Sequence, residues 1–237
     1  MATTVNLATD AGDMALYDVE PEGAPGGAVI VLQEAFGVND HIEDVTRRFA
    51  AAGYRAVAPH LFHRSGDPAL DYGNFEKIFP HMQALTEAGL LEDIDATLGH
   101  LAGAGFASAT VGVVGFCMGG SVTFLAAARR RLGAAVTFYG GGVAEGRFGM
   151  PPLVEMAPRL QTPWLGLFGD EDQGIPVDQV EALRAAAAKA PVATEIVRYA
   201  GAVHGFHCDA RPDSYHEPSA HDAWQRTLDW FGRHLAG

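Results

Sequence analysis

The chain has few cysteines and few cations for its length. Only two cysteines, Cys117 and Cys208, occur in 237 residues, too few for the disulfide framework typical of a small secreted protein. Lys and Arg total 16 against 29 Asp and Glu, which gives a formal net charge of -13. Nucleic acids and anionic membrane surfaces both select basic faces. We therefore expect no nucleic acid and no membrane among its partners.

Long hydrophobic runs are also missing. No apolar run approaches the ~20 residues that a membrane span requires, and residues 1–5 show neither the basic nor the apolar part of a secretory signal. A hydrophobic content of 48% with 19% charged residues is typical of a globular protein with a large core. Since α/β domains often run to ~250 residues, we predict a single domain over residues 1–237. We expect it to be a cytoplasmic monomer or small homo-oligomer.

Short apolar runs alternate along the chain with amphipathic stretches. The pattern predicts an opening hairpin and then strands, at residues 5–9, 14–19, 28–33, 55–58, 110–114, 134–139, 164–168 and 195–199. It predicts helices at residues 41–52 (capped by Asn39 or Asp40), 75–103 (with a break near Gly89), 121–131, 177–190 and 220–235. Strands that alternate with helices indicate a mainly parallel central sheet with helices on both faces, an α/β fold.

The most informative stretch is Gly115-Phe116-Cys117-Met118-Gly119-Gly120. A buried strand, a sharp turn and a helix follow one another there, which is the context of a nucleophile elbow. Gly115 and Gly119 stand two residues to either side of Cys117, where a tight turn leaves no room for a Cβ atom. The N-terminus of a helix favours a thiolate. We predict Cys117 as the nucleophile; the alternative is a buried cysteine in an ordinary turn.

Other reactive side chains follow other predicted strands. In open α/β sheets ligands bind beyond the carboxyl ends of the strands, and Glu34, two aspartates and His204 all come at such ends. The chain order of nucleophile, acid and histidine is that of the α/β-hydrolases. His204 is predicted to exchange protons. We prefer Asp172 over Asp170 as its partner, because Asp172 stands four residues before Pro176, which should open the next helix.

An acyl-transfer site also needs donors for the oxyanion. The backbone N–H groups of Met118 and Ala35 are the predicted pair, one after the nucleophile and one in the loop after an earlier strand. A carboxylate next to a thiol raises the thiol pKa, so Glu34 needs a separate explanation. It either accepts or holds the thiol proton until substrate rearranges the pair, or is a buried acid bound to an arginine or to loop amides.

With these residues the chain resembles the dienelactone hydrolase family of α/β-hydrolases over nearly its whole length. The resemblance rests on residues 33–39, 58–62 and 115–120, on Asp172 with Ile175-Pro176, and on residues 204–206. It implies the α/β-hydrolase fold, a triad of Cys117, Asp172 and His204, and hydrolysis of lactones or small carboxylic esters without metal or cofactor. It also implies that Glu34 takes the thiol proton when substrate binds.

The chain departs from the family at one point. Dienelactone-cleaving members have arginines that grip the substrate carboxylate, one of them four residues after the catalytic histidine. Here that position is Cys208, a second expected position offers Glu76 and Lys77, and Arg211 is out of register. Because a bidentate guanidinium is not easily replaced by a thiol, we expect a substrate other than dienelactone itself to be preferred.

Further side chains are assigned to the surroundings of the site. Phe36, Tyr72 and Phe206 are predicted to line the substrate pocket. Cys208 is predicted to be a structural thiol that also lines it; the alternative is a redox partner of Cys117. His60 and His63 are predicted to face solvent or the pocket wall instead of a metal, since no acid or thiol lies near them in sequence.

Zinc at residues 204 and 207–209 is disfavoured because adjacent residues of an extended segment do not readily converge.

Two functions remain as alternatives: a thioesterase or general carboxylesterase with the same triad, and a non-catalytic small-molecule-binding protein of this fold.

Overall fold

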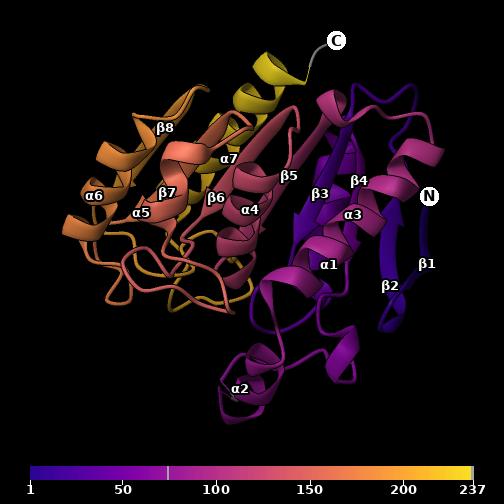
Figure 1. Cartoon of the computed structure of the whole chain (residues 1–237), viewed down its shortest axis with the longest axis horizontal. Helices are drawn as coiled ribbons and strands as arrows, with labels where there is room; N and C mark the ends of the chain where they lie inside the picture. Colours follow the sequence, from indigo (N-terminus) through magenta and orange to yellow (C-terminus); the bar gives the residue numbers. More distant parts are fainter. Residues whose placement is uncertain (74, 236–237) are drawn as a thin grey trace.

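The computed structural model describes residues 1–73 and 75–235, and one sheet of eight strands forms its centre (Figure 1). The strands lie in the order β1-β2-β4-β3-β5-β6-β7-β8. Their bounds are β1 Ala2–Thr9, β2 Gly12–Val19, β3 Ala28–Leu32, β4 Arg55–Pro59, β5 Val111–Phe116, β6 Ala134–Phe138, β7 Trp164–Gly169 and β8 Thr194–Tyr199. Strand β2 is antiparallel to β1 and β4, and all other pairs are parallel. The predicted mainly parallel α/β sheet is confirmed.

Helices cover both faces of the sheet (Figure 1). They are α1 Asp40–Ala51, α2 Phe75–Gln83, α3 Glu87–Gly103, α4 Met118–Arg129, α5 Leu153–Met156, α6 Val177–Ala187 and α7 Glu217–His234. Helices α1 and α7 pack together on one face, where the rings of Phe49 and Trp224 lie 4.5 Å apart. Helices α3, α4, α5 and α6 form a contiguous row on the other face. This arrangement is the α/β-hydrolase architecture expected from the sequence.

Two helix boundaries differ from the prediction. The segment predicted as one helix with a break near Gly89 is two helices, because α2 ends at Gln83 and α3 begins at Glu87. Thr86 caps α3 by accepting the N–H of Gly89, so Gly89 belongs to the first turn of α3. Helix α4 begins at Met118, three residues before the predicted start. Asn39 caps α1 through the N–H of Ile42, one of the two caps considered.

The central strands are apolar along their whole length because both of their faces are covered. Every residue of β3 and of β5 is buried, which is typical of parallel strands between two helical layers. Fully burying one aliphatic side chain such as Ile30 or Val113 contributes about 1.5–3 kcal/mol. This core fixes the positions of the strand ends from which the candidate site is built.

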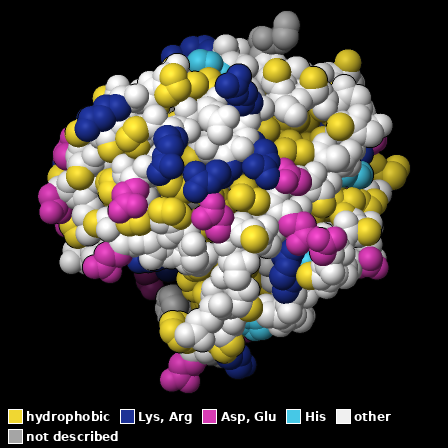
Figure 2. All heavy atoms as spheres, in the orientation of Figure 1, with side chains coloured by type: hydrophobic (Ala, Val, Ile, Leu, Met, Phe, Trp, Pro, Cys, Tyr) yellow, Lys and Arg dark blue, Asp and Glu magenta, His cyan; other side chains and the backbone are white. Residues whose placement is uncertain are grey.

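The carboxyl ends of the parallel strands share one edge of the sheet. The connecting loops and α2 gather along the lower edge in Figure 1, whereas the C-terminus lies at the upper edge. On the face formed by α3 and α4, positive and negative side chains are intermixed (Figure 2); Arg129 pairs there with Glu87 and Arg130 with Asp95. Within residues 1–73 and 75–235, no helix has the length and apolar character needed to cross a membrane.

Candidate active site

Cys117 occupies the tip of a strained turn between β5 and α4. Its backbone has φ 54° and ψ −113°, a conformation that costs a residue with a side chain on the order of 1–3 kcal/mol. Hydrogen bonds to neighbouring strands hold the turn: the N–H of Cys117 donates to Phe138 O over 3.1 Å, and that of Gly119 to Gln33 O over 3.0 Å. The thiol therefore stands at the N-terminus of α4, where the helix dipole favours an anion.

The glycines around Cys117 are required by close backbone contacts. A Cβ atom on Gly115 would lie 2.0 Å from Gly119 O, and one on Gly119 would lie 2.4 Å from Leu32 O. Neither distance is compatible with non-bonded atoms, and both neighbours are backbone. The prediction that this turn excludes side chains at Gly115 and Gly119 is confirmed.

His204 and Asp172 meet at the same edge of the sheet. His204 Nδ1 lies 2.6 Å from Asp172 Oδ2, and the aspartate side chain is only 2% exposed. The second carboxylate oxygen of Asp172 accepts the N–H of Gly174 over 2.8 Å. The competing acid, Asp170, pairs instead with Arg198 at 2.7 and 3.1 Å. The structure thus brings Asp172 to the histidine, as predicted.

The electrostatic environment of His204 favours its imidazolium form. Burial by itself lowers the pKa of His204, but the charge of Cys117 and the hydrogen bonds to Asp172 and Cys117 raise it to about 10. The ring centroid of Tyr139 lies 5.1 Å from that of His204 and supports it from one side. A thiolate and an imidazolium stabilise each other in this geometry.

Glu34 is buried directly after β3 and is only 1% exposed. Neither of its carboxylate oxygens accepts a hydrogen bond within the described part of the chain. The prediction that an arginine or loop amides bind this carboxylate is therefore not supported there. Burial raises the pKa of the Tyr139 hydroxyl, and the negative charges of Glu34 and Cys117 raise it further. The three residues therefore lie close together.

The two backbone N–H groups predicted for the oxyanion are available. Met118 is the first residue of α4, where a helix leaves its N–H groups without intrahelical partners. Ala35 follows Glu34 in the loop after β3. Within residues 1–73 and 75–235, neither N–H is bonded to a backbone carbonyl.

An aromatic and cationic wall stands beside these residues. Phe36 and Tyr72 pack edge to face at 4.6 Å, and the Arg211 guanidinium lies 5.7 Å from the first ring and 5.4 Å from the second. No carboxylate of the described residues is within ion-pair distance of Arg211. Two successive turns, Cys208 N–H to Gly205 O and Arg211 N–H to Cys208 O, carry Arg211 to this position although its register in the sequence had argued against it.

The prediction that Phe206 lines the pocket is wrong. Its side chain is fully buried and packs against Tyr139 at 5.3 Å and Tyr199 at 5.2 Å, so it supports the site from the core. Cys208, predicted to line the pocket, is fully buried, and its thiol donates to the Tyr72 hydroxyl over 3.5 Å. Burial raises the pKa of Cys208 to about 12, so this second thiol stays protonated.

His60 and His63 each have an acidic partner that the sequence did not reveal. His60 lies 2.8 Å from Asp67, and the buried His63 lies 3.0 Å from the buried Asp93. The expectation that both histidines face solvent or the pocket is corrected for His63, which is a structural residue. Across the described ranges, no three His, Cys, Asp or Glu side chains are arranged to hold a metal ion.

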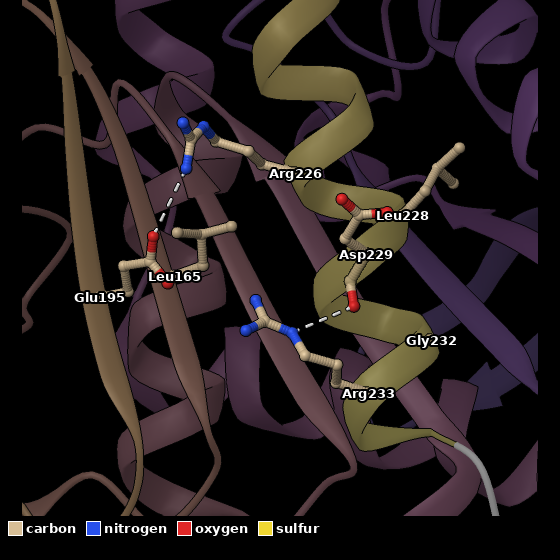
Figure 3. A pocket seen from close by; sticks show the side chains of 7 residues that line it. All are labelled: Leu165, Glu195, Arg226, Leu228, Asp229, Gly232 and Arg233. Atoms are coloured by element: carbon tan, nitrogen blue, oxygen red, sulfur yellow. Dashed lines mark hydrogen bonds and ion pairs between the residues drawn. The ribbon is translucent and has the colours of Figure 1, made fainter.

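A cavity of about 530 Å³ lies away from this site, at the opposite edge of the sheet (Figure 3). It is lined by Leu165 and Glu195 near the starts of β7 and β8, and by residues of α7. Arg226 forms an ion pair with Glu195 at 3.6 Å, and Arg233 donates to the Asp229 carbonyl over 3.3 Å (Figure 3). Both arginines of this cavity are therefore bonded to protein groups, unlike Arg211 at the carboxyl edge.

Comparisons with known proteins relate the chain to one family of hydrolases. The dienelactone hydrolase family matches residues 14–235. A carboxymethylenebutenolidase candidate from Yersinia pestis is 40% identical over 94% of this chain and 84% of its own length. The carboxymethylenebutenolidase of Rhodococcus opacus is 31% identical over 89% of this chain and 82% of its own. The crystal structure of a dienelactone hydrolase candidate from Klebsiella pneumoniae superposes with a TM-score of 0.91 at 39% identity, covering 98% of both chains.

Proposed function

Because the chain belongs to the dienelactone hydrolase family, we propose that it hydrolyses small carboxylic esters or lactones through an acyl-enzyme on Cys117. One observation carries this proposal. The thiol of Cys117 stands at a strained turn, and His204 is held by the buried Asp172, with 2.6 Å between Nδ1 and Oδ2. This set of groups performs acyl transfer on unrelated scaffolds.

The first step is formation of the thiolate. Burial lowers the pKa of His204, but the charge of Cys117 and the hydrogen bonds to Asp172 and Cys117 raise it to about 10, so His204 is protonated beside a thiolate at neutral pH. In the proposed cycle His204 carries this proton before the thiol ionises, so the thiol proton goes to a second acceptor, the carboxylate of Glu34, whose oxygens accept no hydrogen bond among the described residues. The S–H bond of Cys117 breaks and an O–H bond forms on Glu34, which removes the negative charge that opposes the thiolate.

The following steps use His204 as acid and then as base. The thiolate attacks the acyl carbon while the N–H groups of Met118 and Ala35 hold the oxyanion. The imidazolium of His204 protonates the leaving alkoxide, and a thioester remains on Cys117. Neutral His204 then takes a proton from water, the hydroxide cleaves the thioester, and Glu34 returns its proton to the thiolate.

The proposed substrate class follows from Arg211 and the two aromatic rings beside it, Phe36 and Tyr72. Arg211 is a guanidinium without a carboxylate partner among the described residues, stacked over two aromatic rings, and such a group recognises a planar anion. We propose an ester or lactone with a carboxylate near the acyl group. One arginine takes the place of the two expected for dienelactone, so dienelactone itself stays predicted as a secondary substrate. A thiolate nucleophile also favours a reducing compartment, and we propose the cytoplasm.

A substrate panel tests this function. Dienelactone, simple lactones, p-nitrophenyl acetate and an acyl thioester are offered to the wild type, Cys117→Ala and Cys117→Ser. We expect Cys117→Ala to lose more than about 1,000-fold in kcat/KM on every substrate cleaved, with Cys117→Ser also slow because a hydroxyl is rarely ionised. Cys208→Ala is the matched control and retains most of its activity. Full activity in Cys117→Ala refutes the proposal.

A further inference from the structure

Tyr139 resembles Cys117 in having a strained backbone. It directly follows β6 and has φ 39°, in a region that is costly for a residue with a Cβ atom and that is often found at functional sites. Its N–H donates to Leu167 O on β7 over 2.8 Å, and the Phe138 carbonyl of the same peptide unit accepts the N–H of Cys117 over 3.1 Å. One peptide unit therefore ties Tyr139 both to β7 and to the nucleophile.

The ring of Tyr139 contacts two side chains of one loop. Its centroid lies 5.1 Å from that of His204 and 5.3 Å from that of Phe206, with interplanar angles of 61° and 72°. Both contacts are edge-to-face, a favoured arrangement of aromatic rings. Phe206 also packs against Tyr199, the last residue of β8, at 5.2 Å. The Tyr139 ring thus holds the loop that carries His204 against the end of the sheet.

Packing, and not hydrogen bonding, keeps the Tyr139 side chain in place. The residue is fully buried, and its ring lies 6.3 Å from that of Phe116 and 6.1 Å from that of Phe138. Within residues 1–73 and 75–235, its hydroxyl has no hydrogen-bond partner. Because a buried hydroxyl without a partner destabilises a fold, any favourable role of this side chain lies in its ring.

The Tyr139 hydroxyl does not exchange protons with the site. Burial raises its pKa, the negative charges of Glu34, Cys208 and Cys117 raise it further, and the charge of Arg211 lowers it. The net direction of the pKa is upward, so the hydroxyl stays protonated at neutral pH. Tyr139 is therefore neither the acid nor the base of the reaction.

His204 has to be oriented as well as charged. Its contact with Asp172, 2.6 Å from Nδ1, fixes one edge of the imidazole but lets the ring turn about that contact. A misplacement of about 1 Å in a reacting group can cost ~100-fold in rate. A second contact on the ring itself is needed, and the Tyr139 ring at 5.1 Å provides it.

We propose that Tyr139 is a positioning residue, whose ring, held by the strained end of β6, sets the plane of the His204 imidazole so that its Nε2 is directed at Cys117. Tyr139 acts through His204 and takes part in no bond that forms or breaks. The inference rests on the proposed role of His204 as acid in acylation and base in deacylation, so both steps depend on the ring.

Two substitutions of Tyr139 separate the ring from the hydroxyl. In Tyr139→Leu we expect kcat on the best substrate of the panel to fall by about 10–100-fold. KM should change by less than about threefold, because the substrate contacts remain. In Tyr139→Phe we expect kcat within about twofold of the wild type. Its midpoint of unfolding in urea should be at or above that of the wild type, because the unpaired hydroxyl is gone.

Two further enzymes distinguish positioning from a general loss of packing. Phe49→Leu is the matched control, because Phe49 is a fully buried ring that packs against Trp224 and Phe231 of α7; we expect it to lose stability and to keep kcat. Tyr139→Leu is also made in the His204→Gln enzyme. There we expect little further loss, because residues that act as a unit do not have additive effects.

Three results overturn the inference: a wild-type kcat in Tyr139→Leu, an equal loss in Tyr139→Phe, or the same further loss in the His204→Gln enzyme as in the wild type. If Tyr139→Leu does not fold, Tyr139→Met decides in its place, because its unbranched side chain fills the space without a ring. Each of these results, with Cys117→Ala inactive, leaves the proposed hydrolase function in place. Retained activity in Cys117→Ala refutes that function instead.

Discussion

Replacing Asp172 by asparagine reverses the hydrogen bonding of His204 without changing the size of the side chain. The N–H of Gly174 lies 2.8 Å from one oxygen of Asp172, and only the amide oxygen of an asparagine accepts it. The amide NH₂ then faces His204 Nδ1, 2.6 Å away in the present structure. Nδ1 must become an acceptor, so the ring proton moves to Nε2, the wrong tautomer for a base. Loss of the carboxylate charge also destabilises the imidazolium.

The expected loss is large because both effects act on the reacting histidine. A buried aspartate-to-asparagine change of this kind lowers kcat by about 10⁴ in a serine protease, equivalent to roughly 5.4 kcal/mol of transition-state stabilisation at 1.36 kcal/mol per factor of ten. We expect a loss of about 10³–10⁴ in kcat/KM for Asp172→Asn. Steady-state assays on the best substrate of the panel measure it, and circular dichroism checks the fold.

Asp170→Asn is the matched control for this prediction. Asp170 lies two residues away but pairs with Arg198, with side chains 26% and 31% exposed. Such a partly exposed pair contributes about 0–1 kcal/mol to stability and touches no reacting group, so activity is expected to remain near wild type. A larger loss in Asp170→Asn than in Asp172→Asn refutes our assignment of the acid.

Three other predictions concern the elbow, the cation and the charge of the histidine. Gly119→Ala is expected to lower the free energy of unfolding, measured in urea, by more than about 3 kcal/mol, because the new Cβ would lie 2.4 Å from Leu32 O. The control is Gly99→Ala, at a helix position with no atom near the new Cβ. It is expected to be neutral or up to ~1 kcal/mol stabilising. Arg211→Met is expected to raise KM at least about tenfold for carboxylate-bearing esters and little for p-nitrophenyl acetate; equal effects on both refute the anion role. The folded-state pKa of His204, about 10, is above its unfolded value of ~6.5. Its contribution to stability is therefore full below pH ~6.5 and lost as pH rises through about 10, a slope that urea titrations should find in the wild type and not in His204→Gln.

The sequence predicted the sheet well because its strands are continuous apolar runs. Strands β3 and β7 deviate from the predicted ranges by one residue at their ends. The start of α4 was missed because glycine disfavours helices. Gly119 and Gly120 are helical here because their backbones pack against β3 and β6, a tertiary contact with no local signal. The break between α2 and α3 was expected near Gly89. Helix α2 instead continues through Pro80 and ends at Gln83, and α3 begins after Thr86, whose side chain caps it.

The residues of the site were predictable where they directly follow strands. The predictions of Glu34, Cys117 and Asp172 rest on this placement, and the structure puts all three at the carboxyl edge of the sheet. Arg211 was judged out of register, because the sequence does not reveal the two consecutive turns that bring it toward Phe36 and Tyr72. The ion pair between His41 and Asp209, 3.3 Å apart, joins α1 to a loop far along the chain, and no local pattern in the sequence indicates it.

The elbow has a further consequence for how the protein fails on heating. Its turn is tied by backbone hydrogen bonds to Gln33 at the end of β3 and to Phe138 at the end of β6, so Cys117 keeps its place only while the central strands are paired. Heat inactivation and loss of the sheet should therefore occur as one cooperative transition. A folded but inactive state in which only the turn at Cys117 is displaced should not be observed. Among the described residues, Arg211 is held by backbone hydrogen bonds within its own loop, from its N–H to Cys208 O and from the N–H of Ser214 to its carbonyl. Selectivity toward substrates can thus change by mutation of that loop at little cost to the stability of the catalytic turn.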